Sequence, residues 1–164
     1  MSPDDDHDGA LRALAERQAM EVPACRLLWQ AAVLVGEREV LGRGPLGERF
    51  IVPILGGQFW GASGFEALHG RVRPGGADRQ LLRTDGAKEL DALYELQVHD
   101  GTVLTIRNRV LIDESVQPRY VRSQVEVTAP EGPWAWLSRR RLVGTLHPLR
   151  PQAAAVLVRV FELV

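Results

Sequence analysis

From residue 26 to its end, the chain consists of short β-prone segments separated by glycine and proline. Short strands at such close spacing are typical of a sandwich or a barrel. The 16 glycines favour a strongly curved sheet, because bulges and tight bends need residues without a Cβ. We therefore predict an all-β fold, a closed antiparallel barrel. The expected strands are residues 26–35, 49–54, 58–60, 67–72, 79–84, 90–99, 102–111, 120–127, 141–147 and 154–163.

Two of the connections between these strands carry an Asp-Gly pair. Asp85-Gly86 follows one strand, and Asp100-Gly101 joins two others. An Asp-Gly pair suits a type I′ hairpin, in which both central residues need positive φ. We expect a tight hairpin at each pair.

The N-terminal segment differs from the rest of the chain in that its apolar residues recur at helical spacing. It predicts one helix over residues 9–20, capped by Asp8 and lying across an edge or an open end of the sheet. We expect a disordered tail at residues 1–7, a helical extension at 8–22 and a single barrel domain at 23–164.

Composition and charge narrow the classes of function. Hydrophobic residues make up 45% of the chain, enough for a packed core, and the formal net charge of -1 gives no nucleic-acid footprint. The start of the chain is acidic where a signal peptide is basic, and no run approaches the length of a membrane span. The sequence predicts a soluble, cytoplasmic protein with no nucleic-acid or membrane partner.

Metal and cofactor motifs are not found in the sequence. The single cysteine, Cys25, opens an apolar run, so we expect it to be buried and structural. The four histidines lack ligand spacing, and neither a phosphate-binding loop nor a dinucleotide fingerprint occurs. We expect no metal and no cofactor.

Strand alternation sends several polar side chains toward the interior. The rigid corner 73–76 leads into a strand that places Asp78 and Gln80 on one face, opposite two arginines. The apolar faces of the next two strands carry Tyr94 and Asn108. Because a buried polar group without a partner costs roughly 1–3 kcal/mol, these four must bond one another, bind water or line a ligand cavity. A satisfied structural network is the plain alternative.

Two further candidates depend on assumptions about the interior. Arg122 lies on the polar face of its strand and points inward only if the lumen is polar, where it could bind a carboxylate or an enolate oxygen. Trp136, near the turn at Pro133, is either a pocket wall or a core tryptophan.

Taken together, the motifs resemble an uncharacterised family, the domain of unknown function 3237. The resemblance implies a calycin-like or allene-oxide-cyclase-like barrel that self-associates, and it implies no established activity. The recurrent polar positions of the family fall on Asp78, Asp91, Tyr94, Asn108 and Arg122. The likeness lies in residues 47–57, 70–78, 85–86, 90–94, 100–101, 107–109, 120–122, 136–139, 144–145 and 160–163.

Three functions are compatible with these residues. The first is a cofactor-free isomerase, cyclase or hydro-lyase for a small carbonyl or carboxylate compound. Asp78 and Tyr94 would then be catalytic, and Gln80, Asp91, Asn108, Arg122 and Trp136 would bind the substrate. The second is a carrier or sensor of a small hydrophobic ligand in the same barrel. The third is a structural or interaction protein whose polar interior serves packing alone. In each case we expect a homo-oligomer.

Overall fold

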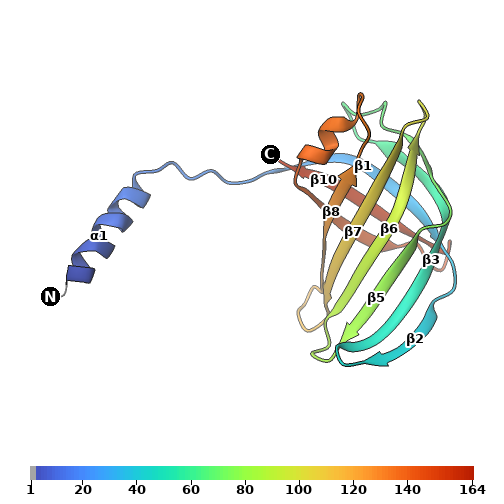
Figure 1. The fold of residues 1–164 in the computed structure, drawn as a ribbon, viewed down its shortest axis with the longest axis horizontal. Helices are drawn as coiled ribbons and strands as arrows, with labels where there is room; N and C mark the ends of the chain where they lie inside the picture. The colour runs from blue at the N-terminus through green and yellow to red at the C-terminus, as the bar shows by residue number, and fades with distance from the viewer. Residues whose placement is uncertain (1–2) are drawn as a thin grey trace.

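The computed structural model describes the backbone of residues 3–164 and the side chains from Asp8 onward. In this part of the chain one α-helix precedes a sheet of ten strands, with a short 3₁₀ helix near the end (Figure 1). The elements are α1 (Pro3–Glu16), β1 (Cys25–Val35), β2 (Glu39–Gly44), β3 (Gly47–Gly61), β4 (Gly70–Val72), β5 (Ala77–Arg83), β6 (Lys88–Val98), β7 (Val103–Asp113), β8 (Tyr120–Thr128), η1 (Ala135–Arg139), β9 (Leu142–Pro148) and β10 (Ala155–Leu163).

The sheet closes on itself through β1, which pairs antiparallel with β10 on one side and with β3 on the other. Strands β1 and β2 both run beside β3, and β4 and β5 both lie between β3 and β6. The ten strands therefore occupy eight positions around the ring, and every pairing is antiparallel. This confirms the all-β, closed antiparallel barrel predicted from the sequence.

Strand β3 joins two segments that the sequence analysis kept apart, 49–54 and 58–60, into one strand that runs through Pro53. The carbonyl oxygen of Pro53 accepts a hydrogen bond from the amide of Gly36, at the break between β1 and β2. The side of Pro53 that lacks an N–H therefore faces that break, so no ladder hydrogen bond is lost there. Strand β2, which the sequence analysis missed, lies beyond the break.

The two Asp-Gly hairpins form, but the expected type I′ turn is wrong. Gly86 and Gly101 have φ of 88° and 91°, whereas no non-glycine residue in the described chain has positive φ. The Asp85 carboxylate accepts a hydrogen bond from the backbone amide of Ala87, and the Asp100 carboxylate accepts one from the backbone amide of Thr102. The aspartates thus stabilise the turns through their side chains, and only the glycines need the left-handed conformation.

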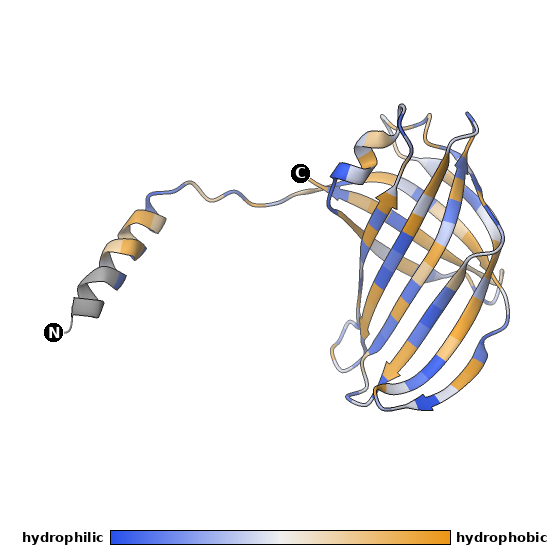
Figure 2. Ribbon diagram, in the orientation of Figure 1, coloured by the Kyte–Doolittle hydropathy of each residue, from blue (hydrophilic) through white to orange (hydrophobic). Residues whose placement is uncertain are grey.

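The hydrophobic core fills one half of the barrel. Hydropathy alternates along the strands, as period-two exposure requires (Figure 2). Inward side chains near the end that carries η1 are the most deeply buried, and several have no exposed surface. They include Leu28, Trp29, Leu68, Leu96, Leu104 and Leu137.

The N-terminal helix differs from its prediction in extent and position. It spans Pro3–Glu16 rather than 9–20, and its described side chains are exposed and stand away from the barrel (Figure 1). Of the expected disordered tail, residues 1 and 2 lie outside the described residues and 3–7 belong to the helix. Proline suits a first helical turn, which explains the early start. Neither helix of the described chain is long and apolar enough to cross a membrane. Cys25, expected to be buried, is exposed.

Gly76, in the corner before β5, has no room for a side chain. A Cβ on Gly76 would lie 2.6 Å from the carbonyl oxygen of Leu93 and 2.6 Å from the Cβ of Tyr94. The amide of Ile54 donates to the carbonyl oxygen of Gly76 at 2.9 Å, which ties the corner to β3. The close approach holds the start of β5 against β6 beside Tyr94.

We therefore expect Gly76→Ala to lower the free energy of unfolding by about 1–3 kcal/mol, the usual range for overpacking. Gly44→Ala is the matched control, because a Cβ there meets nothing within 4 Å. Urea unfolding of both variants measures the difference. Equal midpoints would show that β5 and β6 can separate at this corner without loss.

Candidate functional site

A cavity of about 500 Å³ occupies the half of the barrel that the core leaves unfilled. It opens at the end where β6 begins and where β9 gives way to β10, opposite the end covered by η1. Its walls are apolar and come from seven strands; they include Val33, Val52, Leu90, Val110, Leu146 and Val158. We call this space the lumen cavity, and its volume suits one small organic molecule.

Four polar side chains from three adjacent strands line the lumen cavity: Asp78, Gln80, Tyr94 and Asn108. Asp78 lies opposite Ala92 in the β5–β6 ladder, and Asn108 lies opposite Ala92 in the β6–β7 ladder. The small side chain of Ala92 therefore separates two polar groups on neighbouring strands. Their inward direction agrees with strand alternation, and the structure brings the four together in one space.

These polar groups are not satisfied by one another. Gln80 Nε2 donates to Asp78 Oδ2 at 2.7 Å. Asp78 Oδ1, Gln80 Oε1, Tyr94 Oη and Asn108 Oδ1 are buried and have no hydrogen-bond partner among the described residues. Each such atom costs roughly 1–3 kcal/mol unless water or a ligand supplies the partner. A purely structural network would leave fewer polar atoms unpaired.

The apolar surroundings raise the pKa of both ionisable groups among these four side chains. Burial raises the pKa of the Asp78 carboxyl, an effect that the hydrogen bond from Gln80 and the charge of Lys88 partly offset. Burial alone raises the pKa of the Tyr94 hydroxyl far above its ordinary value, so this phenol remains a proton donor at any physiological pH. A carboxyl with a raised pKa and a neutral phenol are groups suited to proton transfer and to binding an oxygen atom.

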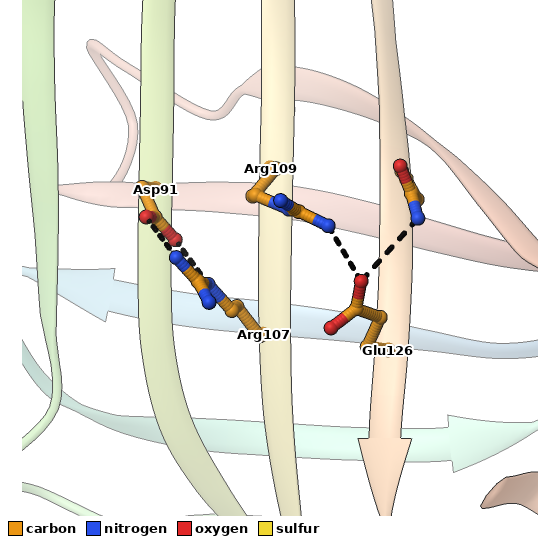
Figure 3. Close-up of polar contacts among 5 residues, drawn as sticks. Asp91, Arg107, Arg109 and Glu126 are labelled. Atoms are coloured by element: carbon orange, nitrogen blue, oxygen red, sulfur yellow. Dashed lines mark hydrogen bonds and ion pairs between the residues drawn. The ribbon is translucent and has the colours of Figure 1, made fainter.

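Asp91 does not belong to the lumen cavity. It lies on the outer face of β6, where Arg107 Nε and Nη2 donate to its two carboxylate oxygens at 3.0 and 2.8 Å (Figure 3). Arg109 and Glu126 form a neighbouring ion pair on the same outer face. The substrate-binding role predicted for Asp91 is therefore not supported, because the pleat directs its side chain to the opposite side of the sheet from Ala92.

Arg122 and Trp136 also lie outside the lumen cavity. Strand β8 turns its valine face inward, so Arg122 lines an open groove of about 840 Å³ along the outer side of β5–β9. Trp136 belongs to η1 at the closed end, 6.0 Å from the Phe65 ring between centroids. The structure thus does not bring either residue to the four polar groups. Arg122 faces outward because the alternating valines of β8 turn to the apolar interior, and the polar lumen that would have drawn Arg122 inward is not formed there.

The sequence analysis missed several residues that line the lumen cavity. Lys88 lies before the predicted start of its strand, and Ala92 has no polar group that would single it out. Arg38 and Arg150 come from connections between strands. Only the inward parity of β6, extended by two residues toward its start, could have identified Lys88.

The described residues contain no group of three or more histidine, cysteine, aspartate or glutamate side chains placed to hold a metal ion. His69 and His99 do come together, with ring centroids 4.3 Å apart and planes 8° from parallel. This pair lies at the surface of the closed end, away from the lumen cavity.

Comparison with known proteins gives a family without an assigned activity. The family model described as "Protein of unknown function (DUF3237)" matches residues 23–163. UPF0311 protein CA_C3321 of Clostridium acetobutylicum is 31% identical over 107 residues, which cover 63% of this chain and 62% of that protein. The match thus spans less than two thirds of the length of that relative. The family match confirms the resemblance drawn from the sequence.

Solved structures share the fold. The crystal structure of the conserved protein of unknown function RPA1785 from Rhodopseudomonas palustris is 26% identical, with a TM-score of 0.76 over 88% of this chain and 100% of that chain. An enzyme from Penicillium herquei is 18% identical, with a TM-score of 0.69 over 90% of this chain and 98% of that chain. The second likeness shows the fold alone.

The burial of Asp78 predicts a pH-dependent effect of its removal. Because the folded-state pKa is raised above the ordinary value of 3.8, the folded protein holds this proton more tightly than the unfolded chain does. Its ionisation therefore lowers stability as the pH rises above that ordinary value. We expect the melting temperature of Asp78→Asn, relative to the native protein, to increase from pH 4 to pH 8.

Asp91→Asn is the control of opposite sign. The hydrogen bonds from Arg107 lower the pKa of Asp91, so that carboxylate contributes stability above its ordinary pKa and loses it in acid. The relative melting temperature of Asp91→Asn should therefore decrease as the pH rises through the acid range to about pH 4, the ordinary pKa, and stay nearly level from pH 4 to pH 8. Parallel slopes for the two variants would contradict the environment assigned to Asp78.

Proposed function

Because the chain belongs to the DUF3237 family of proteins of unknown function, we propose on the geometry of its lumen cavity that it is a cofactor-free enzyme for a small carbonyl or carboxylate compound. The observation that carries the proposal is the set of unpaired polar atoms of Asp78, Gln80, Tyr94 and Asn108 in an otherwise apolar cavity. An active site of this kind needs a few polar groups that converge on one point of an apolar pocket.

The chemistry that fits these groups is proton transfer next to a carbonyl. Asp78 in its ionised form accepts a proton from the carbon beside the carbonyl, and the electron pair moves onto the carbonyl oxygen. The Tyr94 hydroxyl and the Asn108 amide donate hydrogen bonds to that oxygen and stabilise the enolate. The protonated Asp78 then returns the proton to another carbon, which isomerises the compound, or to a departing hydroxyl, which leaves as water.

The raised pKa of Asp78 is compatible with this role. A general base is most effective when its pKa lies near the working pH, and burial moves the pKa of Asp78 upward from 3.8. Gln80 holds one carboxylate oxygen, so the other oxygen, Oδ1, is the one free to meet the substrate. The barrel of the Penicillium herquei enzyme supports the proposal only in so far as this fold can carry catalysis.

Transport or sensing of a small ligand is the second candidate function, because the apolar walls alone would bind a hydrophobic molecule. A purely structural role is less consistent with the structure, since packing alone would not leave a cavity of about 500 Å³ lined with unpaired polar atoms. The expected self-association and cytoplasmic location stay predictions.

Deuterium exchange tests the enzymatic proposal without knowledge of the full reaction. A panel of small ketones, keto acids and unsaturated carboxylates is first screened by thermal shift, and the hits are incubated with the protein in D₂O. We expect deuterium to be incorporated at the carbon beside the carbonyl of at least one compound that binds. Proton NMR monitors this exchange as the loss of the corresponding proton signal. Binding without exchange would favour the carrier over the enzyme.

Two variants locate the activity. We expect Asp78→Asn to reduce the exchange rate by at least about 10²-fold, a typical loss for removing a general base, while binding is retained. Arg79→Gln, on the outer face of the same strand, should leave exchange unchanged. Ala92→Phe should abolish binding, because the ring would fill the space between Asp78 and Asn108. Exchange that survives in Asp78→Asn would remove Asp78 from the mechanism.

A further inference from the structure

The open end of the lumen cavity is cationic. Three basic side chains line it, Arg38 after β1, Lys88 at the start of β6 and Arg150 after β9. Glu37 is the single carboxylate among the residues that line this end. We call Arg38, Lys88 and Arg150 the rim cations. Asp78, the other carboxylate of the cavity, lies deeper.

Lys88 is placed inward by the sheet itself. It has the same parity in β6 as Leu90, Ala92 and Tyr94, so its side chain starts from the inner wall. It is half-buried. Its pKa is lowered mainly by burial and, to a smaller extent, by the nearby charge of Arg38. Arg38 thus lies close enough to Lys88 to disfavour its charge, and neither cation is offset by a bound carboxylate.

None of the rim cations takes part in an ion pair within the described chain, although arginines on the outer wall such as Arg107 and Arg109 do. The Arg38 guanidinium instead lies 4.4 Å from the centroid of the Phe50 ring of β3. Glu114, whose charge also acts on Lys88, is itself paired with Arg119. The charges of Asp78 and Glu114 favour the charged form of Lys88 only in part, since its pKa is still lowered. Two cations without an ion-pair partner at the mouth of an apolar cavity repel each other, and an anion between them would relieve that repulsion.

We infer that the lumen cavity takes an elongated, amphipathic ligand whose anionic group, such as a carboxylate, is held by the rim cations. The inference rests on the proposed function, since it names the class of ligand for the same cavity. The apolar part of the ligand contacts the valine and leucine walls, and its carbonyl end reaches Asp78, Tyr94 and Asn108. Charge-assisted hydrogen bonds to lysine and arginine are the strong kind and fix one end of such a molecule.

The strand geometry sets the length of this ligand. Lys88 and Ala92 are four positions apart in β6, which corresponds to about 13 Å along the strand at ~3.3 Å per residue. The lysine side chain can shorten that span by bending into the cavity. A ligand that contacts both ends is thus longer than a simple keto acid, with its anionic group several bonds from its carbonyl.

Two fluorescent probes that differ in one charged group test the inference. 1-Anilinonaphthalene-8-sulfonate carries an anionic sulfonate, and N-phenyl-1-naphthylamine has the same ring system without it. We expect Lys88→Gln and Arg38→Gln each to weaken binding of the sulfonate probe by about tenfold, as the loss of one charge-assisted contact does. The uncharged probe should change by less than twofold.

Control variants separate charge from folding and from the outer surface. Lys88→Arg keeps the positive charge and should restore binding of the sulfonate probe. Arg79→Gln removes an exposed arginine from the outer face of β5 and should leave both probes unchanged. Melting temperatures of all variants identify any loss of fold, and Lys88 is the primary site because Arg38 also packs on Phe50.

Ala92→Phe distinguishes failure of this inference from failure of the proposed function. If Ala92→Phe weakens both probes while Lys88→Gln and Arg38→Gln affect them equally, the lumen binds ligands and the anionic class is wrong. If Ala92→Phe leaves both probes bound as in the native protein, the probes do not enter the lumen and the inference fails, whereas the proposed function is decided separately by the deuterium exchange of Asp78→Asn. A selective loss of the sulfonate probe in the charge variants, with loss of both in Ala92→Phe, supports both.

Discussion

Closure of the sheet through β1 is the constraint on which the rest of this structure depends. By pairing with both β10 and β3, β1 covers edges of these two strands that an open sheet would leave unpaired. Closure at eight positions also sets the width of the interior, which side chains can fill or which can enclose one small ligand. Here both happen: large apolar side chains fill one half, and the other half keeps a cavity whose walls are apolar apart from a few polar side chains.

The site follows from what closure encloses. Strands β5, β6 and β7 are neighbours in the ring, so Asp78, Ala92 and Asn108 share one level of the inner wall. The packed core beyond Tyr94 supplies the floor, because its apolar side chains exclude water from that end. Burial then acts twice on the same groups: it leaves their polar atoms without partners, and it moves the pKa of Asp78 and Tyr94 upward. The unpaired polar atoms and the buried ionisable groups reduce the stability of the free protein. A ligand or a substrate that forms hydrogen bonds with them would offset that loss.

Sequence reasoning succeeded where the physical cause is local. Alternation placed Asp78, Gln80, Tyr94 and Asn108 inward, because side chains leave a strand on opposite faces by turns. It also placed the valine face of β8 inward, so the alternative in which Arg122 enters a polar lumen is wrong. Reasoning was weaker at boundaries. The helix starts and ends earlier than predicted, β2 was missed, and Lys88 lay just outside its predicted strand.

The amino-acid sequence by itself determined the strand periodicity, the all-β class and the face of each strand that turns inward, because backbone geometry sets these over a few neighbouring residues. The tertiary structure alone decided that β1 meets both β3 and β10, that one half of the lumen stays open, and that Arg38, Lys88 and Arg150 gather at its mouth. Those outcomes depend on register and on the summed volume of side chains from strands far apart in the chain. No local sequence pattern predicts the total volume of the inward side chains. That volume decides whether inward polar groups lie in a packed core or beside a cavity.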